Sequence, residues 1–150
     1  MTAKPEFVFP LLCFTREHEV YGIADDYELR LCGKRALDGG EQLGMEMIEP
    51  DGRSWRVVSV RHVGYAPFKW RYHNWFAPPL RLVEHTYEPG PVLSLDDVKA
   101  RMLAHIDAHP FIYCHFPDDA EELESAKAEV RPLDSIAALY EWVKPDAFLH

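Results

Sequence analysis

The sequence predicts an α+β fold, in which a mainly antiparallel sheet built from N-terminal hairpins carries helices on one face and the C-terminal half is rich in helix. Two observations lead to this class. β-favouring runs separated by turn residues occupy most of the chain up to Tyr87, and helical periodicity with capping residues occupies the rest. Strands first and helices second are typical of α+β proteins, whereas a doubly wound parallel sheet needs the two to alternate.

The length and composition predict a single domain over residues 1–150. The chain has 150 residues, of which 47% are hydrophobic, 13% aromatic and 27% charged, a composition typical of globular proteins. It contains no internal repeat or low-complexity run. The one plausible boundary is Pro89-Gly90-Pro91, and half a chain on either side of it would form a very small core.

The N-terminal part predicts two strands and then a helix. Phe7–Phe14 and Val20–Ile23 are apolar runs joined by a polar turn. Asp25, followed three residues later by Glu28, resembles a capping box, so we expect a helix to begin there. Gly39-Gly40 supplies the left-handed residue that commonly ends a helix.

The middle of the chain predicts a hairpin and a further strand. Met45–Glu49 and Ser54–Arg61 are rich in strand formers and flank the turn sequence Pro50-Asp51-Gly52. Leu80–Tyr87 is a further predicted strand, closed by Pro89-Gly90-Pro91.

The second half predicts helices. Ser94 is the expected N-cap of a helix that runs to about His109, with Asp97 at its third position and Pro110 as its stop. After that helix, Phe111–Phe116 predicts a short strand.

Two more helices are expected beyond this strand. Asp118-Asp119 opens an acidic helix, and Pro132 separates it from a last helix. Four apolar residues at helical spacing form the predicted buried face of that last helix: Ile136, Leu139, Tyr140 and Val143.

Charge and cysteine usage restrict the function. The net charge of −9 disfavours generic nucleic-acid binding. The three cysteines match no disulfide framework, and Phe7–Phe14 is too short to span a bilayer and precedes no cleavage site. We therefore expect a cytoplasmic protein with reduced thiols and no membrane association. The charge is uneven, since Gly52–Val83 carries no acid and six basic residues: Arg53, Arg56, Arg61, Lys69, Arg71 and Arg81.

The aromatic–basic segment 65–76 is the most unusual stretch of the sequence. It interleaves cations with rings, and its candidate binding residues are Lys69, Trp70, Arg71, Tyr72 and Trp75. Such a pattern suits anchors at a protein interface, stacking on single-stranded nucleic acid, or aromatic residues that complete a core while their cations meet the acidic ends of the same chain.

Three residues near the end of the Ser94 helix form a possible metal or catalytic site. His105 and His109 lie one helical turn apart, and Cys114 follows closely. Imidazoles at that spacing can share a metal ion, and a thiolate can add a third ligand. The helix lacks the glutamate of an H-E-x-x-H zinc site, so we expect structural histidines here.

The start of the acidic helix is a second candidate partner-binding region, formed by Asp118, Asp119, Glu121 and Glu122. Carboxylates at a helix start offset the helix dipole, but four exceed what capping needs. A solvated helix face or a docking surface for a basic partner accounts for the excess.

These observations predict a small acidic cytoplasmic binding protein without catalysis and without a cofactor. An inhibitor of a basic partner, of the immunity or antitoxin type, fits the charge and the absence of any local catalytic motif. One alternative is a metal-dependent or hydrolytic enzyme that uses His105, His109 and Cys114. Another is single-stranded nucleic-acid binding through residues 65–76. Neither the partner nor the oligomeric state follows from the sequence.

Overall fold

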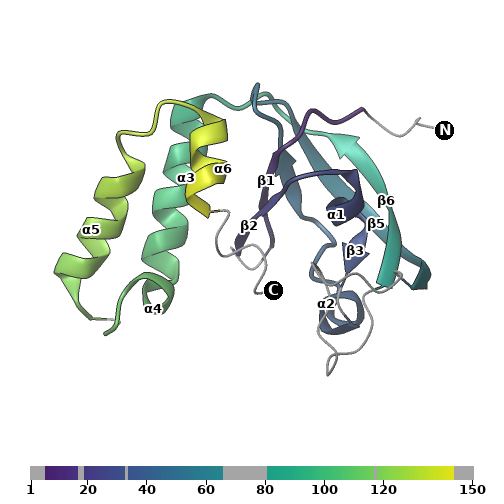
Figure 1. Ribbon diagram of the computed structural model, residues 1–150, viewed down its shortest axis with the longest axis horizontal. Coiled ribbons are helices and arrows are strands. Elements are labelled where there is room, and N and C mark those ends of the chain that lie inside the picture. The colour runs from purple at the N-terminus through teal and green to yellow at the C-terminus, as the bar shows by residue number, and fades with distance from the viewer. Residues whose placement is uncertain (1–5, 17–18, 33, 66–80, 117, 144–150) are drawn as a thin grey trace.

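A curled six-stranded antiparallel sheet with helices confirms the predicted α+β class (Figure 1). The computed structural model describes residues 6–16, 19–32, 34–65, 81–116 and 118–143. The strand order is β2-β1-β4-β5-β6-β3. The elements, in chain order, are β1 (Leu11–Phe14), β2 (Val20–Ile23), α1 (Asp26–Leu29), β3 (Leu31–Cys32), α2 (Lys34–Gly39), β4 (Glu46–Ile48), β5 (Ser54–Tyr65), β6 (Arg81–Pro89), α3 (Leu95–Ala108), α4 (Pro110–Tyr113), α5 (Ala120–Val130) and α6 (Ile136–Val143).

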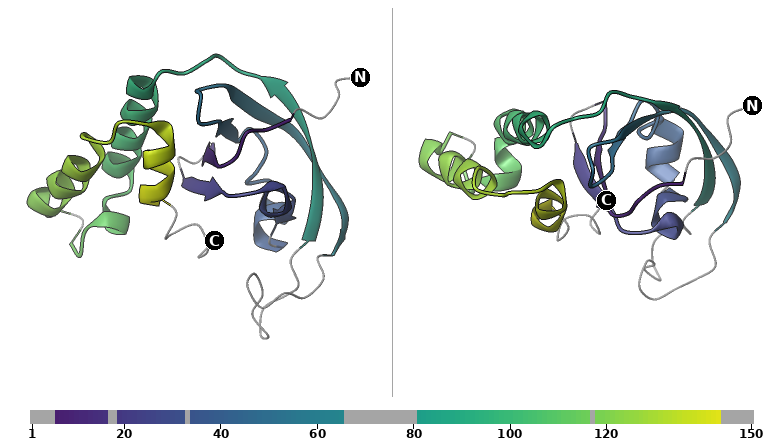
Figure 2. Two further views of the ribbon diagram at one scale, coloured as in Figure 1. Left: turned by 45° about the horizontal axis from the view of Figure 1, so that its top comes forward. Right: turned by 90° about the horizontal axis from the view of Figure 1, so that it is seen from above.

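Strand β1 is buried on both faces, and its alternate side chains enter two different cores. Leu12 and Phe14 join the cluster formed with α3, α5 and α6. Leu11 and Cys13 belong to a second cluster on the opposite face, which includes Leu29 of α1. Successive strand residues point to opposite faces, so this short strand links the helical layer to the interior of the curl. Figure 2 shows the helices on one side of the sheet and α1 within the curve.

The helical layer, formed by α3, α5 and α6, has the cap and the buried apolar residues that the sequence predicts. The Ser94 side chain accepts from the Asp97 backbone, and the Asp97 side chain accepts from the Ser94 backbone, a complete capping box at the start of α3. Val98, Met102 and Ile106 of that helix are fully buried. The four predicted apolar residues of α6 are all buried. The β4–β5 hairpin and the β6 strand are also confirmed.

The helix expected between Asp25 and Gly39 is wrong in its middle. The Asp25 carboxylate does accept from the Glu28 backbone at 2.9 Å, but α1 ends after one turn. Leu31 and Cys32 then form β3, which pairs with β6, and the chain becomes helical again in α2. Pairing with β6, which is distant in the chain, outweighs the local helical propensity of these residues. The edge of the sheet supplies backbone hydrogen bonds, and a local sequence pattern contains no information about them.

The buried carboxylate of Glu49 fixes the β4–β5 turn. It is 0% exposed and lies directly after β4. Its oxygens accept from the backbone N–H of Val8 at 2.7 Å, from Arg53 Nη2 at 3.2 Å and from Trp55 Nε1 at 3.0 Å. These donors tie the segment before β1 to the turn and to β5, and they provide the partners that a buried charge requires.

No helix within the described ranges combines the length and apolarity needed to span a membrane.

Substitution of Glu49 by alanine should lower the free energy of unfolding by about 3 kcal/mol or more, because it leaves buried donors without an acceptor. Urea unfolding measures this change. Glu88→Ala is the control, since Glu88 meets Arg56 at 3.6 Å with both side chains half exposed, and such a pair contributes at most about 1 kcal/mol. Equal losses in the two variants would contradict a structural role for Glu49.

Candidate protein-binding surface

The segment between α3 and α5 forms a helical turn, so the strand predicted for Phe111–Phe116 is wrong. Pro110 takes the first position of α4, and the Cys114 backbone N–H donates to its carbonyl at 2.8 Å. Proline has no N–H to lose and a φ already suited to a helix start, so a proline that ends one helix can begin the next.

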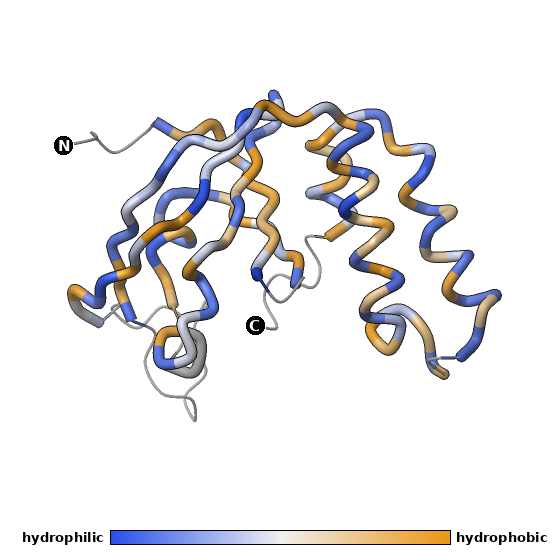
Figure 3. The backbone as a smooth tube through the Cα atoms, turned by 180° about the vertical axis from the view of Figure 1, so that it is seen from behind, coloured by the Kyte–Doolittle hydropathy of each residue, from blue (hydrophilic) through white to orange (hydrophobic). Residues whose placement is uncertain are grey.

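The α4 turn and the residues directly after it expose three large apolar side chains. Phe111 is 64% exposed, Ile112 48% and Phe116 69%. Tyr113 points inward and stacks on Trp142 of α6, with ring centroids 5.6 Å apart. A four-residue helix cannot bury all of its side chains against one neighbour, so the outward ones remain exposed. Figure 3 colours the backbone by hydropathy and shows hydrophobic residues at this turn. We call Phe111, Ile112 and Phe116, together with the adjacent His115, Asp118 and Glu121, the α4 surface.

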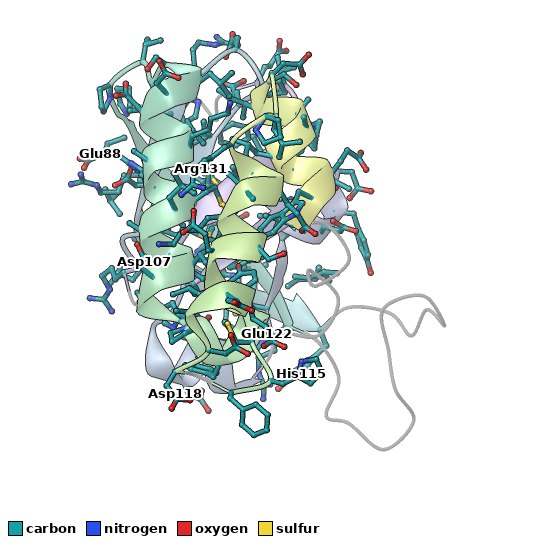
Figure 4. The ribbon with its side chains drawn as sticks, turned by 90° about the vertical axis from the view of Figure 1, so that its left-hand side faces the viewer. Glu88, Asp107, His115, Asp118, Glu122 and Arg131 are labelled. Atoms are coloured by element: carbon teal, nitrogen blue, oxygen red, sulfur yellow. The ribbon has the colours of Figure 1, made fainter. Side chains whose placement is uncertain are left out.

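The four predicted carboxylates divide into two structural ones and two exposed ones. Asp119 is the N-cap of α5 and accepts from the backbones of Glu121 and Glu122, each at 3.1 Å. Glu122 accepts from the His115 backbone at 2.6 Å and lies 2.9 Å from its Nδ1 (Figure 4). Both hold the α4–α5 connection. Asp118 and Glu121 are exposed, and their carboxylates form no hydrogen bond or ion pair with the rest of the described chain.

Neighbouring carboxylates of the helical layer are matched by internal partners. Glu124 pairs with Arg131 at 2.5 Å, and this hydrogen bond and charge lower the pKa of Glu124. Asp107 of α3 pairs with Lys127 at 2.5 Å. Asp118 and Glu121 differ from these two, because neither has such a partner among the described residues.

Three of the arginines in the acid-free stretch Gly52–Val83 have carboxylate partners, namely Arg53, Arg56 and Arg61, whereas Arg81 lies over the Tyr65 ring. Arg56 and Arg61 of β5 each pair with the glutamate directly opposite on β6, Glu88 and Glu84 respectively. The cross-strand position explains both pairs. Lys69, Trp70, Arg71, Tyr72 and Trp75 lie outside the described residues, so the interpretation of the 65–76 segment stays a prediction.

The three residues considered as a possible metal site, His105, His109 and Cys114, are not grouped as ligands within the described residues. The His105 and His109 rings lie 4.9 Å apart, and His105 also meets the Tyr113 ring edge-on. Cys114 Sγ lies 3.9 Å from the Asp119 carbonyl oxygen. Burial raises the pKa of the Cys114 thiol, and the charges of Glu122 and Asp119 raise it further. Across the described ranges, no three His, Cys, Asp or Glu side chains are grouped to hold a metal ion.

Comparisons with known protein families, with curated protein sequences and with solved structures gave no match for this chain. The contacts, exposure and charges of the described residues are therefore the basis for its proposed function.

The Cys114 thiol should ionise at higher pH in the folded chain than in urea, because burial disfavours the reactive thiolate. Iodoacetamide labelling against pH, read for each cysteine by peptide mass spectrometry, measures this difference. Labelling of folded Cys114 near neutral pH should be about tenfold slower than in urea. A folded-state midpoint at lower pH than in urea would reveal an activated thiolate and would contradict a structural role for Cys114.

Proposed function

We propose that this chain is a non-catalytic binding protein that docks on a basic protein through the α4 surface. The observation that supports the proposal most strongly is that exposed phenylalanines and unpaired carboxylates share one short segment. Phe111 and Phe116 are exposed, and Asp118 and Glu121, which follow them closely in the chain, have no partner among the described residues. Protein interfaces commonly combine an apolar centre with a polar rim. Aromatic anchors contribute most of the affinity at such sites.

The charges of the α4 surface favour a cationic partner. The chain carries a net charge of −9, and carboxylates at the rim steer association with basic surfaces. The partner would offer an apolar pocket for the rings, bordered by lysine or arginine side chains. Such a complex suits an inhibitor that covers a cationic active surface, as an immunity or antitoxin protein does.

The same charges disfavour a symmetric dimer through this surface. A two-fold interface places the same patch of both copies in contact. Asp118 and Glu121 of one copy would then approach those of the other, and like charges at an interface cost free energy. A partner of opposite charge removes this cost, so a heteromeric complex fits the α4 surface better than self-association.

Neutralising the exposed pair in an Asp118→Asn/Glu121→Gln variant should slow association with the partner about tenfold at low salt and much less at high salt. Both changes leave the Asp119 cap and the Glu122–His115 contact in place. The matched control is Asp96→Asn/Asp134→Asn, which removes equal charge from exposed residues at the opposite end of the helical layer. Stopped-flow or surface plasmon resonance gives the rates. Equal slowing in both variants would assign the effect to net charge alone.

The partner itself can be sought by photo-crosslinking from Phe116. Replacing Phe116 with benzoylphenylalanine keeps an aromatic ring at the patch, and the same replacement at Val92, which is 73% exposed and lies before α3, is the control. We expect one basic protein to be cross-linked in the native host from position 116 and not from 92. Phe116→Ala should weaken its binding about 30-fold. The proposal fails if no protein is cross-linked, or if both positions capture the same set.

A further inference from the structure

A second feature of the chain is a cleft of about 520 Å³ between the sheet and α3. Its walls come from the end of β1, from β4 and β5, and from Arg101, Ala104 and His105 of α3. A volume of this size suits a small organic ligand. The cleft lies apart from α4 in the chain, and none of its lining residues belongs to the α4 surface.

Three arginines and one glutamate are among the residues that line this cleft, although the chain as a whole is acidic. They are Arg16, Arg56, Arg101 and Glu46. Glu46 forms a hydrogen-bonded ion pair with Arg101, which neutralises one of the three. Of the other two, Arg56 meets only the half-exposed Glu88, and Arg16 has no carboxylate partner among the described residues.

Arg16 is held over the cleft by its aliphatic stem. The stem packs against Gly44, where an added Cβ would lie 2.8 Å from Arg16 Cδ. Within the described part of the chain, its guanidinium makes one long hydrogen bond, from Nη2 to the Gly40 carbonyl at 3.4 Å. Packing therefore positions this charge, and no carboxylate among the described residues pairs with it.

Arg56 has an internal partner that can be exchanged easily. Its contact with Glu88 is 3.6 Å long, both side chains are half exposed, and Glu88 does not line the cleft. Exposed pairs of this kind contribute little free energy. A dianion that meets Arg56 and Arg16 together would compete well with a single exposed carboxylate.

The remaining wall of the cleft is largely apolar. Phe14, which is nearly buried, and Ala104 contribute its apolar part, and the buried His105 adds a polar side chain. Guanidinium groups recognise phosphate through paired, charge-assisted hydrogen bonds. We propose that the cleft binds a small organic phosphate, with Arg16 and Arg56 on the phosphate group and the organic part against Phe14 and Ala104. This site is independent of the α4 surface and of its partner.

Titrations of the full chain followed by ¹H–¹⁵N NMR test this assignment, with phenyl phosphate, inorganic phosphate and benzyl alcohol as probes. Phenyl phosphate should produce saturable shifts at Arg16, Gly44 and Ala104. It should bind about tenfold more tightly than inorganic phosphate, because the ring adds apolar contact. Benzyl alcohol, which lacks the charge, should bind more weakly than either.

The variants Arg16→Gln and Arg56→Gln should each weaken phenyl phosphate about tenfold. Arg61→Gln is the matched control, because Arg61 lies on the same strand, pairs across it with Glu84 as Arg56 does with Glu88, and does not line the cleft. It should bind like the unmodified chain. Absence of saturable shifts, equal affinity for the two phosphates, or an equal loss in the Arg61 variant would overturn the assignment.

Discussion

The two-sided burial of β1 is the constraint on which the rest of the structure depends. Because Leu12 and Phe14 face the helices while Leu11 and Cys13 face the interior of the curl, four residues connect two cores. Helices α3, α5 and α6 then pack on one face of the sheet, and α1 contributes Leu29 to the core on the other. Of α5, Val130 alone is fully buried, at the end far from α4. The opposite end lies at the periphery of the core, which leaves the α4 surface available to another molecule.

Sequence patterns predicted the elements whose signals are local. The capping box at Ser94, the stripe of α6 and the Pro50-Asp51-Gly52 turn all depend on neighbouring residues, and each is present. One prediction is wrong because a contact between residues far apart in the chain determines the local structure. β3 interrupts the helix expected after Asp25 because β6 pairs with it, a contact that no local pattern contains. Pro110 was interpreted only as a stop, although the same properties allow it to start α4.

The candidate site was predicted in part. The density of acidic residues in the sequence predicts that Asp118 and Glu121 are exposed. It does not distinguish them from Asp119 and Glu122, which accept hydrogen bonds within the α4–α5 connection that only the structure reveals. The predicted strand Phe111–Phe116 would place Phe111 and Phe116 on opposite faces and bury one of the two. Phe111 is exposed because α4 is a single turn, and Phe116 is exposed in the connection that follows it. Part of the uneven charge is matched within the chain, since two β5 arginines lie opposite β6 glutamates.

The central claim is that the acidic, aromatic end of the helical layer is the surface that meets a partner. Hydrogen–deuterium exchange of the chain, alone and in complex with the protein captured through Phe116, tests it most directly. Binding is predicted to slow exchange in peptides covering residues 110–116 and 118–122 and to leave the start of α3 unchanged. Slowed exchange confined to the sheet or to the start of α3, with the α4 end unaffected, would contradict the account.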